Sequence, residues 1–298
     1  MLTIAFFGPT GGCANACLAY TLLNGHKAIA LARTPAKLTT QLLEQPGLTT
    51  AILNTQLRII QGDATDMEAV MQTLLVSETP RSLKSAGGDS ATSRPVLVDM
   101  IVSGIGGTGA VSITKASSCD KIKMRVPSLP YVDLANPQIT EQFTVALLGA
   151  LGRVAGRFSC FEEYAGVAPR LVIVSTTGIK AGSKDVPFWV RMMYDMLLAI
   201  PHEDKKRMEE LLEEERGREN SLLVRGLIVV RPSLLEGDHK IVAPGVDDGY
   251  EKKLRVGTEK EPAVGYTVPR AWVGRWIFEE VLKTGGDEWV GEGAILTA

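Results

Sequence analysis

Cysteine and long apolar runs are scarce in this chain, and their scarcity excludes several kinds of protein. Only 4 of the 298 residues are cysteine, no two of them form a CxxC pair, and no histidine stands beside them. The sequence therefore predicts neither a disulfide framework nor a zinc site. No apolar run approaches the about 18 residues that cross a bilayer, and the start, MLTIAFFG, lacks the basic segment of a secretory signal. We expect a cytoplasmic protein with no membrane partner.

An excess of positive charge is also missing. The 32 Lys and Arg residues are balanced by 34 Asp and Glu residues, which gives a formal net charge of −2. Proteins that neutralise phosphate backbones usually carry a basic surplus, so nucleic acid is not an expected partner. With 45% hydrophobic and 22% charged residues, the composition is that of an ordinary globular protein.

Short apolar runs alternate with helical patterns along the first 230 residues. The runs predict strands at Leu2–Phe7, His26–Arg33, Leu57–Gln61, Val96–Val102, Arg170–Ser175 and Leu227–Arg231. The patterns between them predict helices at Gly11–Leu23, Asp66–Leu75, Gln138–Arg157, Val190–Ile200 and Glu203–Glu215, with Ala110–Asn136 mostly loop. This alternation predicts an α/β fold, a Rossmann-type doubly wound parallel sheet.

We expect two regions of unequal size. Residues 1–235 would form a nucleotide-binding Rossmann domain. Residues 236–298 are few for a hydrophobic core of their own, so we do not expect an independent domain there. They contain one amphipathic helix, Val268–Lys283. We expect them to form a small region that covers the substrate at the carboxyl end of the sheet, where ligands of open α/β folds bind.

The segment GPTGGCAN, residues 8–15, stands between the first strand and the first helix. Gly8 permits a tight turn, while Gly11 and Gly12 let the backbone approach a diphosphate without a Cβ collision. Thr10 adds a hydroxyl donor, and the helix that starts near Cys13 turns its positive end toward the same group. The alternative is a glycine-rich turn with no ligand, but the strand-loop-helix context favours a dinucleotide site.

The end of the second strand indicates which dinucleotide binds. NAD-preferring domains commonly place an acidic residue there, whereas this chain has Arg33, Thr34 and then Lys37. A planar guanidinium with a second cation nearby suits the 2′-phosphate of NADP. The alternative is that Arg33 is a solvated strand-end residue. We predict NADP as the cofactor.

These segments together resemble one known family. GPTGGCAN, the LARTPAK segment, Gly62-Asp63-Ala64 and Arg231-Pro232-Ser233 are similar to the atypical short-chain dehydrogenase/reductases, with the NmrA-like NAD(P)-binding branch and its biliverdin/flavin reductases as the nearest group. The likeness covers roughly Leu2 to Leu235 and is weaker in GYTVPRAWVGRWIFEEV; the chain reads like a fungal member.

The resemblance implies roles for residues at the ends of later strands. Asp63 and Ala64 would bracket the adenine, and Ser103, Gly104 and Ile105 would line the ribose side. Ser175, Pro232 and Ser233 would approach the nicotinamide. Each could instead belong to an unexceptional strand-end turn.

Ordinary members of this superfamily pair a Tyr with a Lys four residues later. No tyrosine here has that partner: Tyr131, Tyr164 and Tyr194 are followed at that spacing by Ala or Leu. Lys205 matches the lysine and would anchor the cofactor, but Pro201 stands where the tyrosine would be. Tyr194, His202 and Ser175 are the candidate proton donors, each with a plain structural alternative.

We therefore expect an NADP(H)-dependent oxidoreductase acting on a small apolar organic molecule. The substrate could be a secondary-metabolite intermediate, including one that undergoes redox-controlled cyclisation or isomerisation. The alternative is a non-catalytic NmrA-like sensor in which NADP controls docking to a partner, because a nucleotide site does not establish turnover. The missing tyrosine favours the sensor, and the retained Lys205 favours the enzyme. The sequence leaves the oligomeric state open.

Overall fold

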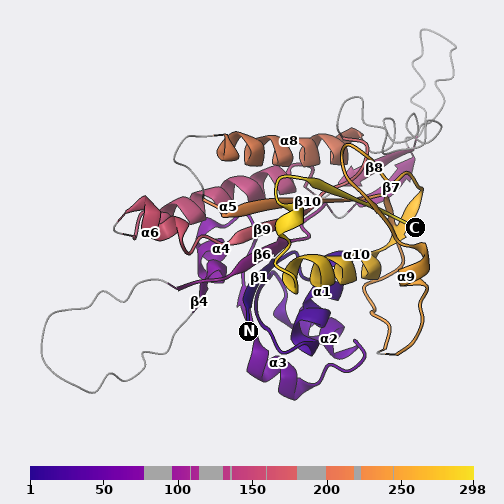
Figure 1. The fold of residues 1–298 in the computed structure, drawn as a ribbon, viewed down its shortest axis with the longest axis horizontal. Coiled ribbons are helices and arrows are strands. Elements are labelled where there is room, and N and C mark those ends of the chain that lie inside the picture. Colours follow the sequence, from indigo (N-terminus) through magenta and orange to yellow (C-terminus); the bar gives the residue numbers. More distant parts are fainter. Residues whose placement is uncertain are drawn as a thin grey trace, which may run out of the picture.

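A computed structural model describes residues 1–76, 96–107, 109–113, 130–134, 136–158, 160–179, 199–217, 223–243 and 245–298. Its centre is a sheet in the order β12-β14-β10-β9-β6-β1-β2-β3 (Figure 1). The strands are β1 (Thr3–Phe7), β2 (Lys27–Ala32), β3 (Leu57–Gln61), β6 (Met100–Ser103), β9 (Arg170–Val174), β10 (Gly226–Pro232), β12 (Arg255–Gly257) and β14 (Gly293–Thr297). Neighbouring strands are parallel except for β12 and β14. The doubly wound Rossmann-type sheet is confirmed.

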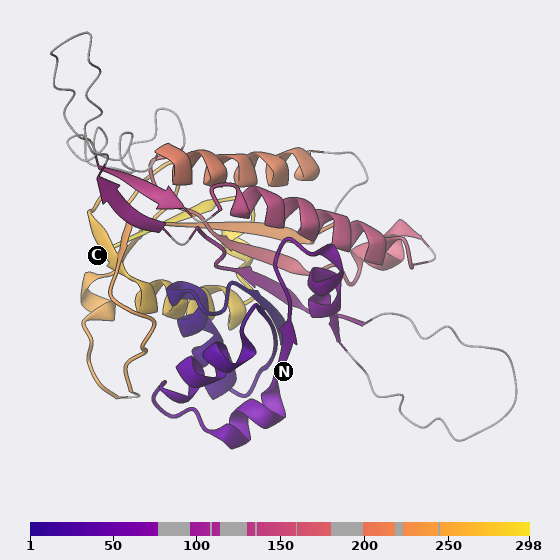
Figure 2. The same ribbon diagram turned by 180° about the vertical axis from the view of Figure 1, so that it is seen from behind.

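Helices cover both faces of this sheet, as Figures 1 and 2 show. One layer contains α1 (Gly12–Leu23), α2 (Pro35–Leu43), α3 (Thr50–Gln56) and α10 (Arg270–Trp276). The other contains α4 (Met67–Leu74), α5 (Ile139–Ala155) and α8 (Ala199–Arg216). Because both faces are covered, the central strands are apolar throughout: Ile4 and Phe6 point into one core, and Ala5 and Phe7 point into the other.

The shorter elements lie at the margins. Three two-stranded sheets pair β4 (Leu75–Val76) with β5 (Val96–Leu97), β7 (Gly109–Ile113) with β8 (Pro130–Leu134), and β11 (Leu234–Glu236) with β13 (Thr267–Pro269). The remaining helices are α6 (Phe161–Ala165), α9 (Tyr250–Lys253), the π-helix η1 (Ile277–Leu282) and the 3₁₀ helix η2 (Asp287–Trp289). No helix among the described residues is long and apolar enough to span a bilayer.

One predicted strand was wrong, and two short strands were not predicted. The run Val96–Val102 is not one strand, because β5 pairs antiparallel with β4 and the main-sheet strand β6 begins only at Met100. The break falls beside Asp99, whose carboxylate accepts a hydrogen bond from the Thr3 backbone N–H at 2.7 Å. The segment Ala110–Asn136, predicted as mostly loop, contributes the antiparallel pair β7 and β8. Its weak pattern and its prolines, Pro127 and Pro130, hid two short strands that satisfy each other's backbone groups.

The predicted helices near Pro201 also differ from the structure. Within the described residues, α8 begins at Ala199 and continues through Pro201 to Arg216; residues 190–198 of the predicted preceding helix lie outside them. Proline is tolerated in the first turn because its missing N–H has no helical partner there. The last predicted helix starts at Arg270 and changes to a π-helix at Ile277.

The C-terminal region shares the core of the rest of the chain. Strand β14 lies between β10 and β12 in the main sheet, and α10 packs on α1. Trp272 and Leu296 belong to the same buried cluster as Ile4. A role for residues 236–298 in covering the substrate stays a prediction.

Candidate cofactor and active site

The glycine-rich segment forms a tight turn where β1 ends. Gly8 has a φ of +69°, in the left-handed region that disfavours other residues, and its carbonyl accepts a hydrogen bond from the Gly11 N–H at 2.9 Å. A Cβ on Gly8 would lie 2.9 Å from the carbonyl carbon of Gly104, which follows β6. Glycine at this position is therefore required by both conformation and space.

Helix α1 begins directly at this turn with its amino end uncapped. Gly11 is the N-cap residue, and no side chain hydrogen-bonds to the first N–H groups of the helix. These groups have no partner within the helix, and with the helix dipole they favour an anion. Ala14 packs closely against the end of β6, since a Cβ on Gly104 would lie 2.7 Å from the Cβ of Ala14. The small residue at this position thus serves helix–strand packing.

A cleft opens at the carboxyl ends of β1, β2, β3 and β6. It holds about 800 Å³, including solvent at its mouth. Its lining contains Gly8, Thr10, Gly11, Arg33, Lys37, Asp63, Ala64, Gly104 and Ile105 from the predicted set, together with Pro9, Leu31, Ala32, Gly62, Gly106 and Ile139. The structure therefore gathers the predicted cofactor residues of four strand ends around one cavity.

Asp63 shapes the turn after β3. Its Oδ1 accepts hydrogen bonds from the N–H of Thr65 at 2.9 Å and from the Thr65 hydroxyl at 2.7 Å. These bonds, and to a smaller extent the positive charge of Arg33, hold the pKa of Asp63 below its ordinary value. Asp63 therefore stays an ionised acceptor at the rim of the cleft.

Several predicted cofactor residues do not line this cleft. Thr34 is the N-cap residue of α2. Cys13 is buried in α1, where burial raises the pKa of its thiol to about 12. Ser103 is buried at the end of β6, and its Oγ accepts a 3.5 Å hydrogen bond from the Ile105 N–H.

Pro232 and Ser233 mark the end of β10. Pro232 is its last residue, and the Ser233 hydroxyl donates to Thr297 Oγ1 at 3.1 Å. Ser233 is thus engaged by the C-terminal strand β14. Gly12 lies under the side chain of Arg270, a residue outside the predicted site.

Lys205 reaches from α8 to the ends of two sheet strands. Its Nζ donates to the carbonyl oxygens of Ile105 at 2.6 Å and Val174 at 2.7 Å. Burial lowers the pKa of Lys205 to about 8, against the raising effect of Asp204 and Glu209. Within the described residues, two of the ammonium's three hydrogens are used, which leaves the third for a ligand.

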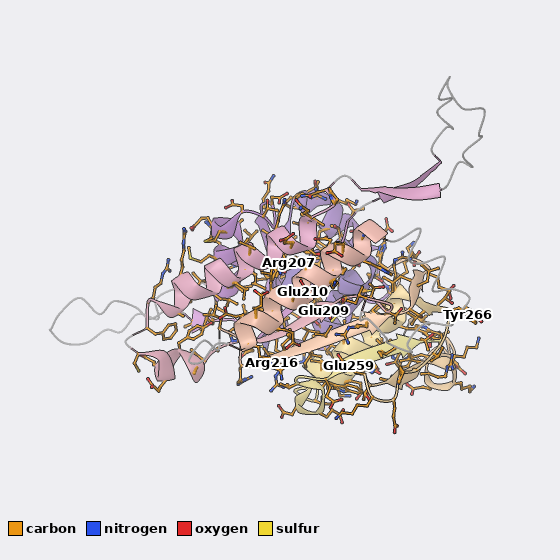
Figure 3. The ribbon with its side chains drawn as sticks, turned by 90° about the horizontal axis from the view of Figure 1, so that it is seen from above. Arg207, Glu209, Glu210, Arg216, Glu259 and Tyr266 are labelled. Atoms are coloured by element: carbon orange, nitrogen blue, oxygen red, sulfur yellow. The ribbon has the colours of Figure 1, made fainter. Side chains whose placement is uncertain are left out.

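Anchors on both sides of Lys205 fix α8. Asp204 caps α5: its two carboxylate oxygens each accept a backbone N–H, from Thr140 and Glu141, at 3.0 Å. One turn after Lys205, Glu209 binds Arg231 of β10. Figure 3 shows Glu209 on α8 and Glu259 in the C-terminal region. Glu259 also contacts Arg231, from which it accepts a hydrogen bond.

Two buried hydroxyls follow β9. Ser175 and Thr177 are 5% and 1% exposed, and neither side-chain oxygen has a hydrogen-bond partner in the described structure. Their N–H groups donate to Val230 and Pro232 of β10, which fixes the backbone. Buried hydroxyls are rarely left unpaired, so these two are suited to receive a polar group from a ligand.

Of the two remaining proton-donor candidates, the structure describes only His202. His202 lies half-buried in the first turns of α8, three residues before Lys205. Tyr194 lies outside the described residues. Tyr164 is fully buried and donates its hydroxyl to the Leu223 carbonyl at 2.6 Å, which makes it structural. No group of metal-ligating side chains occurs in the described parts of the chain.

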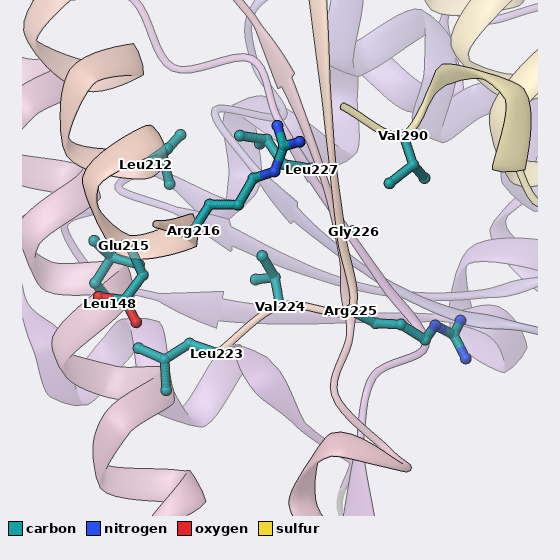
Figure 4. Close-up of a pocket in the computed structure, with 10 residues that line it drawn as sticks. All are labelled: Leu148, Leu212, Glu215, Arg216, Leu223, Val224, Arg225, Gly226, Leu227 and Val290. Atoms are coloured by element: carbon teal, nitrogen blue, oxygen red, sulfur yellow. The ribbon is translucent and has the colours of Figure 1, made fainter. Parts of the chain in front are cut away.

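A second, apolar pocket lies beside the amino end of β10. It holds about 480 Å³ and is lined by Leu148, Leu212, Leu227 and Val290 among others (Figure 4). Gly226, the first residue of β10, lines this pocket. The pocket therefore lies at the amino end of the strand, at the opposite edge of the sheet from the cofactor cleft. Ligands of open α/β folds bind at the carboxyl ends of strands, so the active site is expected at the other end.

Two curated fungal proteins are similar over almost the whole chain. One, named oxidase PynE, from Aspergillus niger, is 45% identical over 301 residues, covering 99% of this chain and 98% of that protein. The other, named reductase PytE, from Aspergillus terreus, is 37% identical, covering 99% of this chain and 97% of that protein. No protein-family profile matches the chain.

Solved structures show the same fold at low identity. A short-chain dehydrogenase/reductase from Veillonella parvula, solved in complex with NADP, gives a TM-score of 0.58 at 12% identity, covering 100% of this chain and 94% of that one. The anaerobilin reductase ChuY from Escherichia coli gives 0.53 at 15% identity, covering 99% and 96%. The chain belongs to one family with these two fungal proteins, named as an oxidase and a reductase, and it has the fold of the short-chain dehydrogenase/reductases.

Proposed function

We propose that this protein is an NADP(H)-dependent oxidoreductase of a small, largely apolar organic molecule. The observation that carries the choice of NADP is the pair of cations, Arg33 and Lys37, that line the cleft beyond β2. The chain offers no carboxylate directly after β2, where an NAD ribose would need one, since Arg33, Thr34 and Pro35 follow Ala32. A guanidinium with a nearby ammonium suits a doubly charged phosphate.

The chain's residues fit the rest of such a dinucleotide. The turn at Gly8 and Gly11, where a Cβ would lie 2.9 Å and 3.2 Å from backbone atoms, and the uncapped start of α1 would hold the diphosphate. When bound, the nicotinamide would supply or accept a hydride. Lys205 would keep a positive charge beside the ends of β6 and β9, and the hydroxyls of Ser175 and Thr177 would orient an oxygen of the substrate.

The substrate proposal follows from the missing tyrosine. Without a tyrosine four residues before Lys205, the protein suits substrates whose hydride transfer needs little acid catalysis, such as flavins, imines and conjugated enones. A fungal secondary-metabolite intermediate that cyclises or isomerises after a redox step fits this description. The relatives are named as an oxidase and a reductase, so both hydride directions belong to the proposal. The free cysteines among the described residues suit a cytoplasmic setting.

The test combines binding with turnover. Calorimetry of the purified protein should show NADP binding, and Arg33→Ala should weaken NADP much more than NAD, because only NADP carries the 2′-phosphate. Incubation with NADPH and a panel of quinones, flavins, enones and imines, followed by nicotinamide absorbance, should show turnover that Lys205→Ala reduces. Equal losses for the two dinucleotides would overturn NADP specificity. Tight binding with no turnover across the panel would favour a regulatory NADP sensor instead.

A further inference from the structure

Arg270, the first residue of α10, lies across the phosphate loop. A Cβ placed on Gly12 would stand 2.2 Å from the Cδ of Arg270 and 2.9 Å from its Cβ. The aliphatic stem of Arg270 therefore fills the space that a side chain at position 12 would need. Arg270, more than 250 positions later in the sequence, therefore packs against the glycine-rich loop at the amino end of α1.

The packing of α10 on α1 fixes this arrangement. One helical turn after Arg270, on the same face of α10, a Cβ on Gly274 would lie 2.5 Å from the carbonyl oxygen of Cys13 and 2.6 Å from the Cβ of Ala16. The two helices thus touch at backbone distance, with glycine on each side of the crossing. Arg270 cannot leave Gly12 without a shift of the whole helix.

Arg270 has no acidic partner among the described residues. Its only hydrogen bond there is from Nη1 to the carbonyl oxygen of Gly237, at 2.6 Å. Arg275, on the same helix, differs: it forms ion pairs with Asp248, Glu251 and Glu279. Within the part of the chain that the structure describes, Arg270 thus keeps an unneutralised charge and several free N–H donors beside the positive end of α1.

The surroundings of Cys13 place a second cation at the same end of the helix. Arg270 and Lys205 both act to lower the pKa of the Cys13 thiol, although burial outweighs them. The amino end of α1 is therefore flanked by two positive side chains, one from α10 and one from α8. Such a concentration of positive charge is unfavourable alone and favourable around an anion.

We propose that Arg270 binds the diphosphate of the dinucleotide, as a cation supplied by the C-terminal region to a loop whose Gly12 makes room for it. This inference rests on the proposed function, since it assumes a dinucleotide in the cleft. A guanidinium forms charge-assisted, two-point hydrogen bonds to phosphate oxygens. Arg33 binds the 2′-phosphate, which only NADP has, whereas Arg270 binds the diphosphate, which NAD and NADP share.

This difference gives a test in which two variants should lose affinity for different ligands. Arg270→Met keeps the stem over Gly12 and removes the charge. Calorimetry should show that it weakens NADP and NAD alike, about tenfold or more, and leaves adenosine 2′-monophosphate, which has no diphosphate, unchanged. Arg33→Ala should weaken NADP and adenosine 2′-monophosphate and spare NAD. Arg270→Lys, which keeps charge without the planar fork, should give an intermediate loss.

Arg275→Met is the matched control on the same helix. It removes ion pairs far from Gly12 and should change the melting temperature without changing dinucleotide affinity. Wild-type affinity for both dinucleotides in Arg270→Met would overturn the inference, and a raised substrate KM in that case would assign Arg270 to an anionic substrate instead. Loss of adenosine 2′-monophosphate binding in Arg270→Met would show a general distortion and would also overturn it. Should the wild type bind neither dinucleotide, the proposed function itself fails.

Discussion

Arg231 at the end of β10 and Glu209 on α8 form a buried two-point ion pair. Arg231 Nε lies 3.0 Å from Glu209 Oε1, and Arg231 Nη2 lies 2.6 Å from Glu209 Oε2. The two residues are 3% and 8% exposed. A third contact joins Arg231 Nη1 to Glu259 Oε1 at 2.5 Å. The pair ties α8 to the sheet one turn after Lys205, so it fixes where the lysine reaches the strand ends.

Removing one member of this pair should destabilise the protein strongly. Glu209→Gln leaves the buried Arg231 guanidinium with Glu259 as its only charged partner among the described residues, and we expect a loss on the order of 3 kcal/mol in the free energy of unfolding, measured in urea. Replacing both members by apolar residues, Glu209→Leu with Arg231→Met, should recover much of the loss. Glu210→Gln is the control, because Glu210 pairs with exposed cations and should cost less than about 1 kcal/mol. Equal losses in the two glutamate variants would contradict the role of the buried pair.

The charge of Lys205 should make the activity depend on pH, with a decline above about pH 8. Its pKa is lowered to about 8 because its ammonium is buried, so the charge beside the ends of β6 and β9 is present below that pH and lost above it. We expect kcat/KM of the wild type to fall as the pH rises through about 8. Lys205→Met should have low activity without this decline. A wild-type profile flat through that range would argue against the lysine's charge acting in the reaction.

The same shift predicts how stability changes with pH. Lysine has an ordinary pKa of 10.5, which we take for the unfolded chain, and about 8 in the folded protein. Between these values the unfolded state binds more protons, so this site makes the free energy of unfolding rise with pH. Urea titrations of the wild type should therefore gain stability relative to Lys205→Met from pH 8 to pH 10.5. A constant difference between the two proteins would contradict the lowered pKa.

Much of the cofactor cleft could be predicted because its signals are local. Gly8, Arg33 and Asp63 each follow a short apolar strand, and parallel strands bring their carboxyl ends to one edge of the sheet. Lys205 was identified by spacing alone, through the resemblance, and the structure places its ammonium at the ends of two of those strands.

The rest could not be predicted because it depends on contacts between distant segments. Nothing in the local pattern of VPRAW shows that Arg270 lies on Gly12. Gln45 reads as an ordinary polar residue after a helix, yet it is 2% exposed and bound to residues 239 and 241. The break in Val96–Val102 escaped prediction because tertiary hydrogen bonds decided it, while the run of side chains is apolar on both sides of Asp99.

Gly8→Ala should abolish tight dinucleotide binding. The new Cβ would need a positive φ and would stand 2.9 Å from the backbone of Gly104, so the turn that faces the diphosphate must shift. Gly25→Ala is the matched control: Gly25 has a φ of +78°, but nothing lies within 4 Å of its Cβ position. It should cost about 1–2 kcal/mol of stability from strain alone and leave the affinity for NADP unchanged. Calorimetry and thermal unfolding of both variants separate strain from steric blocking, and unchanged NADP affinity in Gly8→Ala would place the diphosphate elsewhere.

Gln45 joins the phosphate loop to the chain that follows β11. Its Nε2 donates to Asn15 Oδ1 and to the His239 carbonyl, both at 2.8 Å, and its Oε1 accepts from the Ile241 N–H at 2.9 Å. Asn15 in turn donates to the Pro9 carbonyl at 2.8 Å. One buried amide therefore holds both the loop at Pro9 and the C-terminal segment in place.

Gln45→Leu should accordingly disturb two places at once. It leaves the His239 carbonyl, the Ile241 N–H and one side of Asn15 without partners, and each unpaired buried group costs about 1–3 kcal/mol. We expect at least about 2 kcal/mol lower stability in urea, together with weaker NADP binding, because Asn15, which holds the Pro9 carbonyl, loses the bond that fixes its own side chain. Gln41→Leu, one turn earlier in α2, is the control, since Gln41 Oε1 has no hydrogen-bond partner in the described structure; its change should stay within about 0.5 kcal/mol. If Gln45→Leu loses stability but binds NADP normally, the network is structural and does not support the loop, because a loop held through Asn15 cannot lose that contact without a change in the affinity it provides.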